Sequence, residues 1–179
     1  RQRMSSDEFL AWAMEQPDGR RYELVGGEVV AMSPERLAHT ETKALVWLAL
    51  RTAIERAGLD CQALADGVSV EVEEGTIYEP DALVRCGERL PGDTVKLSDP
   101  VIVVEVLSPS TRARDAGAKL EDYFRLPSVR HYLIVKTDSR SAIHHRKDAS
   151  GAIETRILRG GRLDLDPPGL TVEVEAFFE

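Results

Sequence analysis

Two acidic residues beside aliphatic runs are the strongest candidates for chemistry in this sequence. Residues 101–111 read VIVVEVLSPST, a run that predicts a buried strand, and Glu105 interrupts it. Because an unpaired charge is costly to move out of water, this carboxylate must be neutralised, paired or bound to a cation. Asp81 stands at the head of a second apolar run, within YEPDALV. Two acids on neighbouring strands would form a metal site; the alternative is a pair of strand-end carboxylates, one exposed and one bonded to an arginine.

Two further ionisable residues are weaker candidates. Glu23 lies in a predicted β-hairpin around Gly26-Gly27 and shares its strand face with the apolar Val25. It would either bind a metal or pair with a lysine. His39 falls in the first turns of a long predicted helix, where a surface or partly buried polar role is more common than catalysis.

A later predicted helix carries Asp115, Lys119 and Tyr123 at four-residue intervals, so these residues share one face. Asp115 and Lys119 can pair there, although a plain surface ion pair is the usual meaning of this spacing. The adjacent His144 and His145 point to opposite faces of a predicted strand and cannot bind one ion together.

The two cysteines, Cys61 and Cys86, lack any CxxC or Cys/His ligand spacing. We interpret them as buried free thiols, and the sequence predicts no zinc site.

The candidate residues must be positioned by a chain that is rich in strands and has two substantial helices. Helices are predicted from Ser5 to just before Pro17, over residues 33–57, and over residues 112–126, the last capped by Ser110 or Thr111. The expected buried stripe of the second helix is Leu37, Ala44, Leu45, Leu48, Ala49 and Ala53. Besides the central run, strands are predicted at residues 22–25, 28–32, 61–64, 68–72, 77–84, 131–136, 141–146, 153–158 and 170–174. This order predicts an α/β or α+β fold, a sheet packed by the helices.

Composition indicates one globular domain. The chain has 179 residues, of which 42% are hydrophobic and 30% charged, enough to bury a core. Excluding the first three residues, which precede Met4, the expected domain covers residues 4–179. No apolar run approaches the roughly 20 residues that a membrane span requires, so we expect no membrane contact and a soluble, cytoplasmic protein.

Charge argues against broad nucleic-acid binding driven by electrostatics, because the formal net charge is -8. The average hides an asymmetry, since residues 112–147 contain nine Lys/Arg and four Asp/Glu. This segment forms either a local basic face beside an acidic site or a solvated face without a partner.

Taken in order, several segments resemble one known family. They are YEL at 22–24, Gly27-Glu28, His39, Pro80-Asp81, EVLSPST at 105–111, and Asp115, Lys119 and Tyr123. Together they resemble the Uma2 family, also called DUF820, of restriction-endonuclease-like proteins, over nearly the whole chain. The resemblance implies a fold of the PD-(D/E)xK nuclease type, a mixed central sheet flanked by helices.

The resemblance also implies a site. Asp81 and Glu105 would bind the metal, Glu23 would be a third acid, and Lys119 would replace the lysine usually found at the position of Leu107. The backbone carbonyl of Val106 would add a neutral ligand, while Asp115 and Tyr123 would orient the lysine. Mg²⁺, or Mn²⁺, suits such a carboxylate site.

The expected function is therefore metal-dependent hydrolysis of DNA, with a homodimer consistent with cutting both strands of a duplex. One alternative is a nuclease fold with an idle site that binds nucleic acid or protein. Another is a metal-dependent phosphoesterase that acts on a small nucleotide. Because clustered acids repel one another without an ion, raised carboxylate pKa values are expected in the absence of metal.

Overall fold

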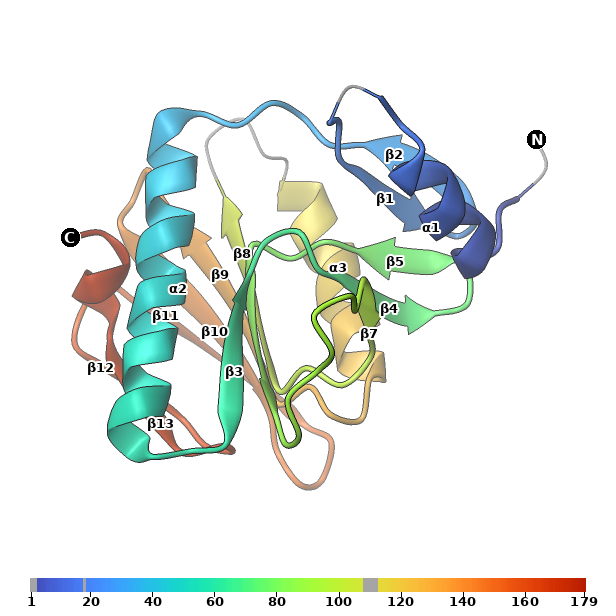
Figure 1. The fold of residues 1–179 in the computed structure, drawn as a ribbon. Helices are drawn as coiled ribbons and strands as arrows, with labels where there is room; N and C mark the ends of the chain where they lie inside the picture. Colours follow the sequence, from blue (N-terminus) through green and yellow to red (C-terminus); the bar gives the residue numbers. More distant parts are fainter. Residues whose placement is uncertain (1–2, 18, 108–112) are drawn as a thin grey trace.

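The computed structural model describes residues 3–17, 19–107 and 113–179, apart from the side chains of residues 113–116. Within these ranges the strands form a six-stranded, a five-stranded and a two-stranded sheet (Figure 1). No helix in this part of the chain is long and apolar enough to cross a membrane.

The six-stranded sheet has the order β11-β10-β9-β8-β6-β3. Its strands are β3 (Cys61–Ala65), β6 (Ala82–Cys86), β8 (Ile102–Leu107), β9 (His131–Lys136), β10 (Ser141–Lys147) and β11 (Ile153–Leu158). β8 and β9 run parallel, and the other neighbours are antiparallel. The sheet is therefore mixed, as expected.

The five-stranded sheet has the order β2-β1-β5-β4-β7 and carries the N-terminal helix. Its strands are β1 (Tyr22–Val25), β2 (Glu28–Ala31), β4 (Ser69–Glu73), β5 (Thr76–Tyr78) and β7 (Lys96–Leu97). Helix α1 (Ser6–Met14) begins at a capping box in which Ser5 and Glu8 satisfy each other's backbone N–H groups, and this confirms the predicted cap. The predicted hairpin of β1 and β2 is also confirmed.

Two helices cover opposite faces of the six-stranded sheet (Figure 1). Helix α2 (Leu37–Ala57) lies on one face, beside the two-stranded sheet of β12 (Arg162–Leu165) and β13 (Leu170–Glu173) and the short 3-10 helix η1 (Val174–Phe177). Helix α3 (Ala113–Arg125) lies on the other face, with β4, β5 and β7 of the five-stranded sheet. The central strand β8 is therefore buried on both sides, which explains its nearly continuous apolar sequence.

The predicted buried stripe of α2 is wrong in part, since Ala53 is buried and Ala49 packs against the core as expected. Leu37 and Leu48 are 74% and 51% exposed, whereas Val46 and Leu50 are fully buried against the sheet. The helix also begins at Leu37, after the N-cap residue Arg36, and not at residue 33. The reason is that several helical faces carry apolar residues, so the sequence does not show which face meets the sheet.

The predicted single strand over residues 77–84 is also wrong. The chain leaves the five-stranded sheet at the end of β5 and enters the six-stranded sheet at the start of β6. Pro80 has no N–H group and cannot continue a ladder of hydrogen bonds, which explains the break. Asp81 consequently lies at the junction of the two sheets.

Cys61 and Cys86 form a disulfide, so the interpretation as free thiols is wrong. The two residues are directly opposite each other in the antiparallel pair of β3 and β6. Their pairing depends on strand register across 25 residues of sequence, which spacing along the chain does not show. The predicted capping residues of the third helix, Ser110 and Thr111, lie outside the described residues.

Candidate active site

Strand β8 directs Glu105 toward helix α3. Side chains alternate along the strand, with Val104 and Val106 in the core beside α2 and Val103 in the core beside α3. Glu105 shares the parity of Val103 and is only 8% exposed. The carboxylate is thus held in the protein interior by the same alternation that buries the rest of the strand.

Helix α3 supplies two partners to this carboxylate. Lys119 Nζ lies 3.1 Å from Glu105 Oε1, and the hydroxyl of Tyr123, one helical turn later, donates a hydrogen bond of 2.8 Å to the same oxygen. Lys119 Nζ also lies 2.7 Å from Glu23 Oε1 on β1 and 4.9 Å from the ring centroid of Tyr78. The lysine therefore joins α3 to both large sheets.

The backbone and the side chain of Asp81 both form hydrogen bonds with strand β8. Its backbone N–H donates to the carbonyl of Val104, and its Oδ2 accepts the N–H of Val106 at 2.6 Å. The residue is 5% exposed. The Asp81 carboxylate is therefore bonded to the peptide group that joins Glu105 to Val106.

A histidine from the first turn of α2 completes this contact. His39 Nε2 lies 2.6 Å from the Val106 carbonyl oxygen and 3.7 Å from Asp81 Oδ2. Since a carbonyl can only accept, Nε2 donates this hydrogen bond. His39 Nδ1 is buried without a hydrogen-bond partner among the described residues and lies 3.5 Å from Glu35 Oε2.

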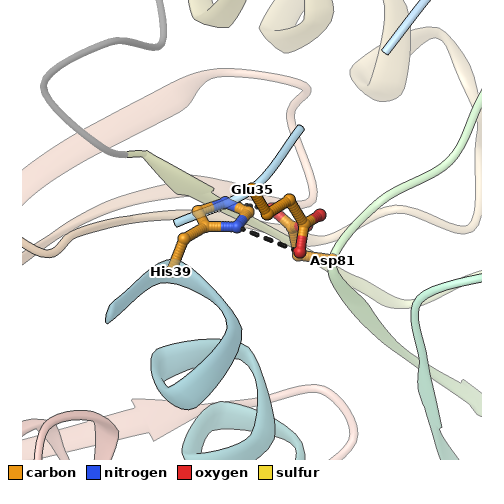
Figure 2. Close-up of side chains that lie close together, drawn as sticks. All are labelled: Glu35, His39 and Asp81. Carbon is orange, nitrogen blue, oxygen red and sulfur yellow. Dashed lines mark ion pairs between the residues drawn. The ribbon is translucent and has the colours of Figure 1, made fainter. Parts of the chain in front are cut away.

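Glu35, His39 and Asp81 converge, and Figure 2 shows the imidazole directed toward both carboxylates. Each of the three offers one ligand atom, and these atoms lie within 4.8 Å of one another. Such a group of oxygen and nitrogen donors fits a divalent cation.

Two basic side chains support the acids around this group. Lys43 Nζ lies 2.5 Å from Glu35, 2.6 Å from Asp66 and 3.9 Å from Asp81. Arg21 pairs with Glu35 at 3.3 Å, with Asp66 at 2.7 Å and also with Glu79. With Lys119 included, three bases face six acids: Glu23, Glu35, Asp66, Glu79, Asp81 and Glu105. The surplus of negative charge favours a cation.

Burial changes the proton affinity of the two central acids. It raises the pKa of Asp81 to about 6, although the Val106 N–H and Lys43 act in the opposite direction. Burial likewise raises the pKa of Glu105 to about 7 against the effect of Lys119. For Lys119 burial lowers the pKa, but the carboxylates of Glu105 and Glu23 outweigh it and raise the pKa above the ordinary value. Near neutral pH the lysine is charged, Asp81 is mostly ionised and Glu105 is close to its pKa, so a metal ion would compete with protons chiefly at Glu105.

The structure brings together most of the residues singled out in the sequence: Asp81, Glu105, Val106, Lys119, Glu23, Tyr123 and His39. Asp115 lies on α3, but its side chain is outside the described part of the chain. The alternative of one exposed and one arginine-bonded acid is wrong, because Asp81 and Glu105 are both buried and neither pairs with an arginine among the described residues.

Several contacting residues were missed from sequence: Arg21, Glu35, Lys43, Asp66 and Glu79. Glu35, His39 and Lys43 recur at four-residue intervals, the spacing of one helical face, and this was the available signal. The loop residues Asp66 and Glu79 gave no such signal, since their contacts with Lys43 and Arg21 depend on how the two sheets pack.

Comparison with known proteins gives the same family and fold. The family Uma2, described as "Putative restriction endonuclease", matches residues 6–176. An uncharacterized protein of Synechocystis sp. is 28% identical over 178 residues, covering 98% of this chain and 92% of its own. The crystal structure of a "putative nuclease belonging to DUF820" from Anabaena variabilis superposes with a TM-score of 0.78 at 14% identity, covering 98% of this chain and 97% of that one.

Proposed function

The chain belongs to the Uma2 family of restriction-endonuclease-like proteins, and we propose that it is a metal-dependent nuclease that hydrolyses phosphodiester bonds of DNA. The observation that carries the proposal is the hydrogen bond of the Asp81 carboxylate to the N–H of Val106, the residue after Glu105, with the ammonium of Lys119 3.1 Å from Glu105. Two buried acids that can bind a cation, beside a partly buried ammonium group, suit phosphodiester hydrolysis.

The cation ligands in this proposal are the carboxylates of Asp81 and Glu105 and the carbonyl oxygen of Val106. Glu35 and His39 extend the donor set on the α2 side of Asp81. A divalent cation there would neutralise charge that develops on the phosphate and would lower the pKa of a water molecule. Mg²⁺ suits the oxygen donors, and the imidazole of His39 makes Mn²⁺ an equally good match.

Lys119 acts as the electrostatic group in this scheme. The carboxylates of Glu105 and Glu23 stabilise its positive charge. The ammonium has three N–H donors, so it can donate a hydrogen bond to a phosphate oxygen and still keep its contacts with both carboxylates. Tyr123 fixes the orientation of Glu105 through its hydroxyl. We assign Asp115, one helical turn before Lys119, the predicted role of orienting the lysine.

The test combines metal binding with cleavage. Mg²⁺ and Mn²⁺ are titrated by calorimetry into the wild type, Glu105→Gln and Asp81→Asn, with Glu41→Gln as the control at an exposed position of α2. Each protein is then incubated with supercoiled, linear and single-stranded DNA. We expect both central variants to lose cation binding and nicking together, and the control to keep both.

The other outcomes separate the alternatives. A wild type that binds neither cation and leaves every DNA intact would indicate a nuclease fold with an idle site, in which Lys119 and Tyr123 merely satisfy Glu105. Cleavage of a small phosphodiester without cleavage of DNA would indicate a phosphoesterase acting on nucleotides.

A further inference from the structure

The outer strand of the six-stranded sheet, β11, has the features of a strand that pairs with another chain. Its residues Ile153 and Ile157 are 44% and 70% exposed. Its register with β10 is unbroken, from Ala142 opposite Leu158 to Lys147 opposite Ile153. The strand contains no proline, lysine or bulge, three of the devices by which proteins prevent pairing at a sheet edge, and its two charged residues are of opposite sign.

The opposite edge of the same sheet is protected. β3 lies beside α2, and the indole N–H of Trp47 donates a hydrogen bond of 3.1 Å to the carbonyl of Ala63. The contrast within one sheet indicates that the exposure of β11 is specific to that edge.

We propose that β11 pairs with β11 of a second copy of this chain, antiparallel and around a two-fold axis at Thr155, joining two six-stranded sheets into one. In this register Ile153 faces Ile157 of the second copy, and Glu154 faces Arg156 of the second copy. Thr155 faces its own counterpart. Aliphatic pairs, Thr–Thr pairs and pairs of opposite charge are all favourable directly across strands.

The sequence of the strand selects this register. An axis at Glu154 would place two glutamates opposite each other, and an axis at Arg156 would place two arginines opposite each other. Within the described residues, neither Glu154 nor Arg156 takes part in an ion pair, and both are exposed. Arg146 is opposite Glu154 on β10, and Arg156 helps to lower the pKa of Asp164, but both side chains remain exposed and can also face the second copy.

The site around Glu105 lies on β8, three strands away in the sheet order, so this interface does not depend on the proposed activity. A symmetric contact of one patch with itself is the commonest route to a closed dimer. The two inferences can therefore fail separately.

Charge reversal tests the pairing without disturbing the core. Glu154→Arg alone places arginines opposite each other at two positions, and Arg156→Glu alone places glutamates there. We expect sedimentation velocity to show a wild-type dimer, and each variant to weaken homodimerisation by about tenfold or more. Mixing the two variants restores opposite charges at both positions, so the mixture should dimerise again, as should the doubly substituted chain.

Cross-linking tests the register. Under oxidation Thr155→Cys should form a disulfide between copies, because residue 155 faces itself, whereas Ile153→Cys alone should not, because its counterpart lies four residues away along the strand. A wild type that remains monomeric at about 100 μM would overturn the proposal. A dimer that persists in both charge-reversal variants and that Thr155→Cys does not cross-link would also overturn the proposal, because its interface would lie elsewhere.

Discussion

Replacement of Glu105 by glutamine should change the pH dependence of stability more than any other substitution at the site. Burial raises the pKa of this carboxyl from its ordinary 4.5 to about 7, so the folded protein binds a proton more tightly than the unfolded chain does. The stability that this proton provides is fully present below pH 4.5 and is lost as pH rises through about 7. At 1.36 kcal/mol per pH unit, the loss approaches about 3 kcal/mol.

Glutamine has nearly the same shape but does not titrate. We therefore expect Glu105→Gln to gain about 2.5 kcal/mol relative to the wild type between pH 5 and pH 8, without metal, because part of the full effect lies outside this range. The measurement is urea denaturation at both pH values in the presence of a chelator, with Glu41→Gln as the exposed control. Titrating groups far from Glu105 contribute equally to both proteins and cancel in the difference. Asp81, Glu23 and Lys119 interact with Glu105, so any change in their titration is part of the measured difference. A difference between the two proteins that is the same at pH 5 and pH 8 would refute the reasoning.

Three further predictions follow from named contacts. Lys119→Ala should lower plasmid nicking by about 10²–10³-fold while keeping cation binding, with Lys119→Arg retaining part of the activity; unchanged nicking would remove the lysine from the mechanism. Burial lowers the pKa values of the bonded pair His131 and His144 to about 4, so stability should fall by up to about 3 kcal/mol for each histidine as pH drops from 6.5 to 4. In urea denaturation His144→Gln should reduce this slope, and an unchanged slope would contradict the assignment. Serine at both Cys61 and Cys86 should lower the free energy of unfolding by about 3 kcal/mol, and an unchanged urea midpoint would show that the disulfide contributes nothing.

The features predicted correctly from sequence are those that residues close together in the chain determine. A nearly continuous run of aliphatic residues identified the central strand, and the same run made Glu105 conspicuous because a carboxylate interrupts it. The capping box at Ser5 and the hairpin at Gly26-Gly27 are likewise signals that a few adjacent residues carry in full.

The features that were missed depend on contacts between distant segments. The Cys61–Cys86 disulfide requires the register of β3 on β6, and the break at Pro80 requires that two different sheets form on either side of it. The contact of Lys43 with Asp66 requires that the first half of α2 lies beside the end of β3. No window of sequence shorter than the domain contains that information.

The origin of the lysine that we propose to be catalytic couples chemistry to packing in this chain. The position two residues after Glu105 on β8 is Leu107, and the lysine comes instead from α3. A lysine on the strand would be fixed by the hydrogen bonds of the sheet, whereas Lys119 is placed only as well as α3 is docked. That docking rests on the fully buried Tyr123 and the nearly buried Phe124, and the Tyr123 hydroxyl bonds to Glu105 itself. Tyr123 therefore both anchors the helix and orients Glu105, so the packing of α3 against the sheet positions Lys119 and Glu105 together.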